Sequence, residues 1–504
     1  VEAILSTQDE DGYIGIYDKE LRYNFNSENG ELWSKATLYR GLLAFYEYTN
    51  DEKVFTAVKN AVNNVMINYP INASSPFSSG TSFNGGVSHG LTFTDILERM
   101  YFHTKDEKYR DYALFLYNDF SNTYQSEADV QLKNILDSNY KLKSHGVHTF
   151  EHIRTLIIAK YAAQDATLSK ALDIYLDRIK QAATISGGAI GDEWIAERNA
   201  DATFTGYEYC SLQELLDSYC LLLQKTGNST IGDEIENIFY NAAQGSRNPN
   251  HSCIAYLKTD NSFEMLGTKN GEVEPDRKQT RYKYSPAHQD VAVCCNPNAG
   301  RISPYFIQNA WMKGENTLVA TLLMPNILHA QINGKDIQIE NITTYPNQND
   351  FILKITQSKS SKFIIKIRIP NWAIKINTTE KNRLQDGYMV IEREFSANDS
   401  IQFSFETDVK IKSAATGAHY FTYGALLYAL PIGANEIAGK NYTGNFTDFT
   451  YEPTSNLRYQ FNSNPKTKYI NGKIQTELIN LITKQMEVVE LIPFGKTILR
   501  QTTF

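Results

Sequence analysis

The sequence lacks the features that mark several large classes of protein. No apolar run among its 504 residues is long enough to cross a bilayer, so we expect no membrane span. The net charge is −8, and no long cluster of Lys and Arg would follow a phosphate backbone, so nucleic acid is not expected as a partner. Five unevenly spaced cysteines are too few for a disulfide scaffold, which leaves metal binding or catalysis as their role.

Common cofactor motifs are also missing. The sequence has no glycine-rich dinucleotide loop, no P-loop, no His-Glu-x-x-His motif and no Gly-x-Ser-x-Gly elbow. Nucleotide chemistry is therefore disfavoured. Aromatic residues are plentiful at 12%, with 32 Tyr and 25 Phe. Their flat faces suit sugar rings, although such side chains fill cores more often than they line clefts.

The N-terminal part carries a repeated helical pattern. Apolar residues at spacings of three and four flank short polar breaks, at residues 49–53, 104–108, 164–165 and 225–228. An Asp or Asn near most of these breaks can cap the next helix. Helical hairpins that repeat in this way predict an α/α toroid or solenoid. Unrelated helices that share the same cap chemistry are the alternative.

After Trp311 the pattern changes to short alternating runs, as in 363–369 and 401–405, which are typical of a β-sandwich. Asn-Gly and Asp-Gly pairs at 333–334 and 386–387 predict hairpin turns. A second β segment is expected to follow residues 424–428 and to end near the C-terminus, and residues 443–450 are expected to form a loop. The predicted domains are a helical catalytic domain at 1–310, a β-sandwich at 311–415, and a second β-rich segment at 416–504 that packs on the sandwich or the helical domain.

Four residues could bind one metal ion. Cys294 and Cys295 are adjacent, so both reach one ion only on an irregular turn, which Pro297 would favour. Glu208 and Cys210 are two residues apart, as in a chelating pair on an extended segment. Together they offer four ligands of the kinds that zinc accepts. Buried free thiols beside a surface glutamate are the alternative.

Other polar residues could act on a substrate. Glu193 precedes Trp194, and a carboxyl group beside an indole is partly desolvated, which suits it to donate a proton. Asp192 competes for that role, and a solvated loop acid is the alternative. His89 and His145 each precede a helical pattern, where they could bind sugar hydroxyls or serve as structural histidines.

Several of these motifs resemble the bacterial β-L-arabinofuranosidase family, glycoside hydrolase family 127 and its relatives. Cys294-Cys295-x-Pro297-Asn298-x-x-Arg301 resembles the family's Cys-Cys-x-Pro-Asn-x-x-Arg motif. The other matching segments are Gln8 with residues 11–15, Glu208-x-Cys210, residues 238–242, Arg368-Ile369-Pro370-Asn371-Trp372-Ala373 and Gly387-Tyr388.

The resemblance implies a multidomain α+β fold with an (α/α)6 barrel followed by β-sandwich domains. It also implies Zn²⁺ bound by Glu208, Cys210, Cys294 and Cys295. Cys294 would be the nucleophile and Glu193 the acid/base, with His89, His145 and Trp194 in contact with the sugar. An extracytoplasmic location, in the periplasm of a bacterium, is expected from the resemblance and from the absence of an initial methionine.

The function expected from these features and from the resemblance is that of a zinc-dependent, retaining exo-glycoside hydrolase. It would remove a terminal, arabinofuranose-like sugar from a plant or algal oligosaccharide. One alternative is a lyase or dehydratase that acts on uronate-containing oligosaccharides through its histidines and tyrosines. The other is a carbohydrate-binding protein without catalysis.

Overall fold

The computed structural model describes residues 1–24, 30–81, 84–191, 193–270 and 280–504. The chain divides into two compact units. The first unit comprises Val1–Ala182 and Glu193–Asn199, and the second comprises Ala183–Asp192 and Ala200–Phe504. Within the described ranges, no helix combines the length and the apolar character that a membrane span requires.

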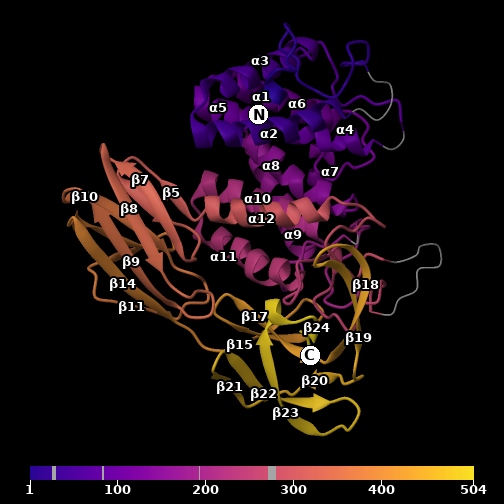
Figure 1. The fold of residues 1–504 in the computed structure, drawn as a ribbon, viewed down its shortest axis with the longest axis vertical. Helices are drawn as coiled ribbons and strands as arrows, with labels where there is room; N and C mark the ends of the chain where they lie inside the picture. Colours follow the sequence, from indigo (N-terminus) through magenta and orange to yellow (C-terminus); the bar gives the residue numbers. More distant parts are fainter. Residues whose placement is uncertain (25–29, 82–83, 192, 271–279) are drawn as a thin grey trace. The chain divides into compact units, whose positions relative to one another are not determined.

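The first unit is helical, and its chain order is visible in the indigo and purple ribbon of Figure 1. Its helices are α1 (Glu2–Leu5), α2 (Glu31–Thr49), α3 (Glu52–Asn68), α4 (Gly85–His89), η1 (Gly90–Thr92), α5 (Phe93–Thr104), α6 (Lys108–Asn122), α7 (Leu132–Leu136), α8 (Gly146–Ala163) and α9 (Ala166–Gln181).

Three of the four predicted hairpins lie in this unit, as α2–α3, α5–α6 and α8–α9. Asn50, Lys105 and Gln164 end the first helix of each pair in the left-handed conformation. Asp51 and Asp165 cap two of the second helices through backbone N–H groups. The polar breaks therefore stop one helix and start the next, as the sequence pattern predicts.

The second unit contains the fourth hairpin and all the long strands. Its helices are α10 (Tyr209–Thr226), α11 (Ser229–Asn237), the π-helical turn η2 (Ile238–Ala243) and α12 (Cys295–Gln308). Gly227 adopts a left-handed φ of 63° after α10, and Asn228 caps α11 through the backbone N–H of Thr230. Short strands β1 (Tyr207–Glu208) and β3 (Leu257–Lys258) pair antiparallel beside α10.

Two five-stranded sheets form the predicted β-sandwich. Their strand orders are β12-β13-β10-β6-β5 and β11-β14-β9-β8-β7. The strands are β5 (Trp311–Lys313), β6 (Thr317–Ala320), β7 (Asn326–Ile332), β8 (Lys335–Ile342), β9 (Asp350–Gln357), β10 (Ser361–Arg368), β11 (Lys375–Thr378), β12 (Arg383–Gln385), β13 (Tyr388–Phe395) and β14 (Asn398–Glu406).

Alternating side chains of the two sheets share one apolar core, in which Ile339, Phe351, Ile365 and Phe403 are buried. The predicted runs 363–369 and 401–405 fall mainly in β10 and in β14. Both predicted hairpin turns are present, because the Asn-Gly pair at 333–334 and the Asp-Gly pair at 386–387 all have positive φ.

Two further sheets complete the unit. One has the order β15-β16-β17-β23-β22-β20, with β21 on β22 and β24 on β17, and the other has the order β18-β19-β4-β2. The strands are β2 (Ile254–Ala255), β4 (Tyr284–Ser285), β15 (Lys410–Ser413), β16 (His419–Tyr423), β17 (Leu426–Ile432), β18 (Ala434–Thr443), β19 (Phe446–Pro453), β20 (Tyr459–Phe461), β21 (Thr467–Ile470), β22 (Lys473–Asn480), β23 (Met486–Pro493) and β24 (Leu499–Gln501).

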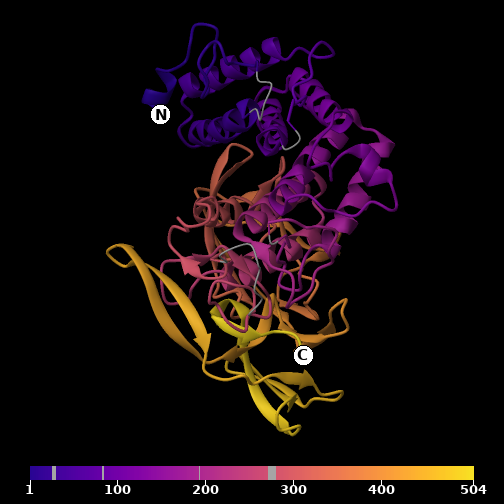
Figure 2. The ribbon, with the colours of Figure 1, turned by 90° about the vertical axis from the view of Figure 1, so that its right-hand side faces the viewer.

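The loop predicted at 443–450 is wrong. Most of that stretch is β19, which forms a long hairpin with β18 (Figure 2). Phe449 of β19 also pairs with Tyr284 of β4, which lies far away in the sequence. Threonine is β-branched and suits a strand, and this long-range pairing outweighs the polar composition on which the loop prediction rested.

A buried ion network joins α11 to the sandwich. The Arg368 side chain is fully buried at the end of β10, where its Nη1 lies 2.5 Å from Asp233 Oδ1 and its Nη2 pairs with Glu236. Its Nε donates a hydrogen bond to the carbonyl oxygen of Thr321 at 2.6 Å. Only a glycine fits at position 232, because a Cβ there would lie 2.5 Å from Arg368 Cδ.

Replacing Arg368 by alanine is expected to lower the free energy of unfolding by about 3–5 kcal/mol, because Glu236 would remain as a buried, unpaired carboxylate. Urea denaturation followed by circular dichroism measures this loss. Arg383→Ala is the control, since Arg383 is half exposed and pairs with Glu392 at the surface. The control should change stability by no more than about 1 kcal/mol. Equal losses in the two variants would contradict the structural role of Arg368.

Candidate active site

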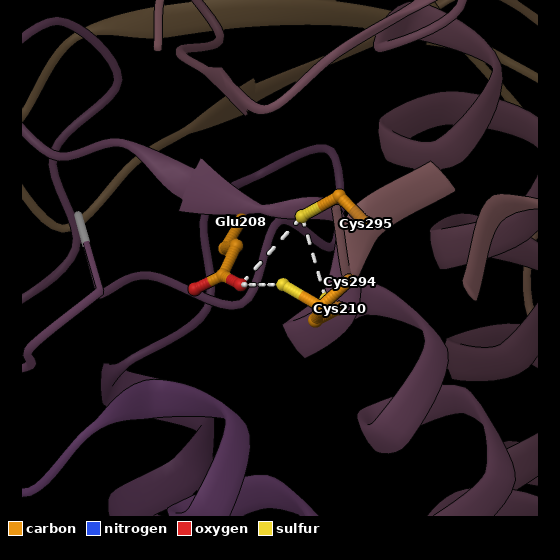
Figure 3. Close-up of side chains that lie close together, drawn as sticks. All are labelled: Glu208, Cys210, Cys294 and Cys295. Atoms are coloured by element: carbon orange, nitrogen blue, oxygen red, sulfur yellow. Dashed lines mark hydrogen bonds between the residues drawn. The ribbon is translucent and has the colours of Figure 1, made fainter. Parts of the chain in front are cut away.

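Four potential metal ligands meet at the N-terminal ends of two helices in the second unit. Glu208 ends β1 and immediately precedes α10, and Cys210 lies in the first turn of α10. Cys294 immediately precedes α12, which begins at Cys295. One donor atom of each residue lies within 4.8 Å of the others (Figure 3). The structure thus brings together the four residues that the sequence suggests as metal ligands.

Both adjacent cysteines lie at the start of α12. Cys294 is the N-cap residue, whose φ of −57° and ψ of −37° are already helical, and Cys295 is the first helical residue. Pro297 does not make the irregular turn that the sequence analysis expects. It lies in the first turn of α12, where a residue without an N–H group is tolerated because that group would have no helical partner.

Two of the thiols approach the same carboxylate oxygen, and the third thiol contacts one of them. Glu208 Oε1 lies 3.8 Å from Cys294 Sγ and 3.6 Å from Cys295 Sγ. The Sγ atoms of Cys210 and Cys295 are 3.4 Å apart. Figure 3 marks these contacts with dashed lines. Two helix N-termini face this cluster, and their dipoles favour negatively charged ligands.

Burial separates Cys294 from the other thiols. Glu208, Cys210 and Cys295 are at most 2% exposed, whereas Cys294 is exposed, unlike the other four cysteines. Burial raises the pKa of the Cys210 and Cys295 thiols well above its ordinary value. These two thiols therefore hold their protons unless a cation replaces them. Cys294 is thus the one member of the four-residue cluster that is exposed to solvent.

A second layer of polar residues holds the cluster. Asn298 Nδ2 donates to Cys210 Sγ at 3.0 Å, and Arg301 Nη1 donates to Asn298 Oδ1 at 2.8 Å. Arg301 also pairs with Glu214 at 3.4 Å, so the amide of Asn298 has a fixed orientation. Tyr256 Oη lies 3.6 Å from Cys294 Sγ. No sequence pattern marks Tyr256, because it reaches the cluster through the pairing of β3 with β1.

The donor set fits a zinc ion. Three thiols and one carboxylate are four ligands of the kinds that Zn²⁺ binds, and four protein ligands match its tetrahedral preference. The buried, hydrogen-bonded surroundings of Cys210 match the outer layer that such sites need.

A histidine cluster lies in the first unit. His89, at the end of α4, and His148, in the first turn of α8, face each other with 2.6 Å between their Nε2 atoms. His89 Nδ1 lies 2.8 Å from Glu151 Oε1, and His148 Nδ1 lies 2.5 Å from Glu127 Oε2. Of these residues only His89 was predicted from the sequence, whereas His148, Glu127 and Glu151 were not.

Burial dominates the electrostatics of this histidine cluster. It raises the pKa of Glu127 to about 8, although the positive charge of His89 opposes the shift. It also lowers the pKa of His148 well below its ordinary value, with the neighbouring histidines acting in the same direction. The ring of His148 is therefore neutral near pH 7.

The predicted sugar-binding residues form one row of rings in the first unit. The ring of His145 lies 5.1 Å from that of His148 and 5.6 Å from that of Trp194. His148 in turn contacts the ring of His89 at 3.7 Å, and Trp33 stacks on His89 at 4.3 Å. His148 thus connects the three residues that the sequence suggests.

Glu193 belongs to the same unit and has an unusual backbone. Its φ is +77°, in the left-handed region that favours glycine, and its carbonyl oxygen accepts a hydrogen bond from Gly146 N at 2.7 Å. Trp194 pairs with His145 in a β-bridge. Strain of this kind often marks a functional position. Asp192, the competing candidate, lies outside the described residues.

Family models match most of the chain. Residues 1–308 match the model described as β-L-arabinofuranosidase, GH127 catalytic domain, and residues 317–407 match the GH127 middle domain. No curated protein matches the sequence.

Solved structures show the same fold. One is a GH127 β-L-arabinofuranosidase from Geobacillus stearothermophilus T6, at 15% identity and a TM-score of 0.71, covering 100% of this chain and 84% of that one. Another is a GH127 β-arabinofuranosidase at 17% identity and a TM-score of 0.72, covering 98% of this chain and 80% of that one. The predicted fold class, an (α/α)6 barrel followed by β-sandwich domains, is confirmed.

The chain is therefore a glycoside hydrolase, an enzyme that acts on oligosaccharides. It belongs to glycoside hydrolase family 127, since the catalytic-domain model alone covers more than half of its length.

Proposed function

We propose that this enzyme is a zinc-dependent, retaining exo-glycosidase that removes a terminal β-L-arabinofuranose-like sugar. The observation that carries the proposal is the selective exposure of Cys294 within a cluster whose other three members are buried. Glu208, Cys210, Cys294 and Cys295 would bind the Zn²⁺. When bound, Zn²⁺ would keep the thiols deprotonated at neutral pH.

The proposed reaction has two displacements. In the first, Cys294 Sγ attacks the anomeric carbon, the glycosidic bond breaks, and Glu193 donates a proton to the leaving oxygen. In the second, Glu193 takes a proton from water, whose oxygen attacks the same carbon. The carbon–sulfur bond breaks as the new carbon–oxygen bond forms, and the electron pair returns to Cys294 as a thiolate. Two inversions leave the configuration of the sugar unchanged.

The remaining residues have supporting roles in this proposal. Tyr256 contacts Cys294 Sγ and would position it, whereas Asn298 contacts Cys210, a thiol that stays buried. His89, His145 and Trp194 offer ring nitrogens and an indole face to the sugar. Cys210 is buried and Cys294 is exposed, which fits a role for Cys210 as a metal ligand only and for Cys294 as the nucleophile.

The stereochemistry of the product tests this proposal. Incubation with an oligosaccharide that ends in β-L-arabinofuranose is expected to release one monosaccharide with the gain of one water. The first product seen by proton NMR should be the β-anomer. The same oligosaccharide with an α-linked end is the matched control and should stay intact. Initial release of the α-anomer would contradict a Cys294 nucleophile, and a mass lower by one water would indicate elimination instead.

A further inference from the structure

The facing imidazoles of His89 and His148 form an unusual pair. A neutral imidazole has one N–H and one lone pair, and here a carboxylate lies against Nδ1 of each ring. With the proton of each ring on the Nδ1 that faces a carboxyl group, the two Nε2 lone pairs face each other across 2.6 Å. Two lone pairs at this distance repel unless a cation lies between them.

The surroundings of the pair favour a metal ion as that cation. A histidine that binds a metal through one nitrogen usually has a carboxyl group against its other nitrogen, as His148 has here in Glu127. Glu127 is 1% exposed, and its second oxygen, Oε1, is buried without a hydrogen-bond partner among the described residues. Buried carboxylates of this kind favour a nearby positive charge.

Glu151 supplies a third donor. His148 and Glu151 are three residues apart on α8, so they project from the same face of that helix. One ligand atom of each of His89, His148 and Glu151 lies within 4.8 Å of the other two. Metal–nitrogen bonds of roughly 2.0–2.1 Å need the two Nε2 atoms only about 0.7 Å further apart than they are.

We propose that His89, His148 and Glu151 form a binding site for a divalent transition-metal ion, separate from the cysteine cluster. Two imidazoles and one carboxylate suit Zn²⁺, Ni²⁺ or Fe²⁺ and leave coordination positions open for oxygen ligands. The His89 side chain is 19% exposed, so solvent reaches one edge of the site. The indole of Trp33, stacked on His89 and 43% exposed, offers a flat apolar face beside it. Hydroxyl or carboxylate oxygens of a sugar are the chemical class that such a site would take.

Ni²⁺ titration of the full-length, reduced protein tests this site. In isothermal titration calorimetry, His148→Asn and His89→Asn are each expected to bind one equivalent of Ni²⁺ per chain fewer than the unmodified protein. Glu127→Gln should keep the equivalent but bind it roughly 10–100-fold more weakly, because it replaces the carboxyl group behind the His148 ring by an amide. His103→Asn is the matched control, since His103 is similarly exposed and pairs with Glu47 but faces no other imidazole among the described residues. This variant should bind Ni²⁺ like the unmodified protein.

Two measurements keep the result decisive. Thermal unfolding identifies any variant that fails to fold, and His89→Asn, at the more exposed position, is the safer of the two. Cys210→Ser should lose metal from the cysteine cluster and keep the equivalent bound by the histidines, which separates this proposal from the proposed zinc site. Equal stoichiometry in the unmodified protein, His148→Asn and His89→Asn would overturn the proposal and leave a shared proton between the two rings.

Discussion

Replacing Cys294 by serine is expected to lower the turnover of a terminal arabinofuranoside by roughly 10⁴-fold or more, the size of loss seen when a covalent nucleophile is removed. A serine hydroxyl keeps the shape of the side chain but is a far weaker nucleophile than a thiolate. Since Cys294 is exposed and serine has nearly the same size and shape, the substitution should leave stability nearly unchanged. Initial rates and a urea denaturation curve measure the two effects.

Cys253→Ser is the matched control, because Cys253 is a free cysteine of the same unit that lies outside the four-residue cluster. It should retain most of the turnover. Mass spectrometry of the unmodified enzyme, quenched during turnover, should detect a sugar on the peptide that contains Cys294 and none in the Cys294→Ser variant. Full turnover by Cys294→Ser would show that this sulfur forms no bond to the sugar.

The sequence predicted the members of the cysteine cluster, because they occupy two short motifs. Glu208-x-Cys210 and Cys294-Cys295 each place two donors within three residues, so only one long-range contact, between α10 and α12, is needed to assemble them. The turn expected at Pro297 was wrong because a proline also fits the first turn of a helix. The spacing of apolar residues around Pro297 does not distinguish an irregular turn from the first turn of a helix.

The histidine cluster could not be predicted in this way. Glu127 lies in an irregular segment between α6 and α7, and it meets His148 only after the chain has turned back at α8. His148 stands beside His145 in the sequence, but only the structure places its Nε2 against His89. The hairpin β18–β19 was missed for a similar reason, since its pairing with β4 joins segments about 165 residues apart, Tyr284 and Phe449.

The helical hairpins were predictable because their signals are local. A polar break, a residue that tolerates the left-handed conformation and an Asp or Asn cap all lie within a few residues of each other, as at Asn50 and Asp51. The β-sandwich likewise followed from alternation and two hairpin turns. Packing between distant segments is what the sequence did not specify, and it is this packing that creates the sites.

Replacing Glu193 by glutamine is expected to lower turnover by roughly 10²–10⁴-fold for substrates with a sugar leaving group, because the amide cannot donate or accept the proton that the two displacements need. The loss should be much smaller for the first displacement on an aryl glycoside whose leaving phenolate is stable without protonation. Burst kinetics with such a substrate separate the two displacements. A general acid affects them in this unequal way, whereas a residue that only shapes the loop would slow both substrates alike.

The left-handed backbone of Glu193 allows a second variant to separate its chemical role from its structural one. Glu193→Gly removes the carboxyl group but suits the φ of +77°, so it should match Glu193→Gln in lost turnover and exceed it in stability by about 1 kcal/mol. Glu197→Gln is the matched control, since Glu197 lies in the same loop, is exposed and also has a positive φ of 62°. It should keep its turnover. If Glu193→Gln and Glu197→Gln were equally active on sugar and aryl substrates, the acid/base would have to be another residue.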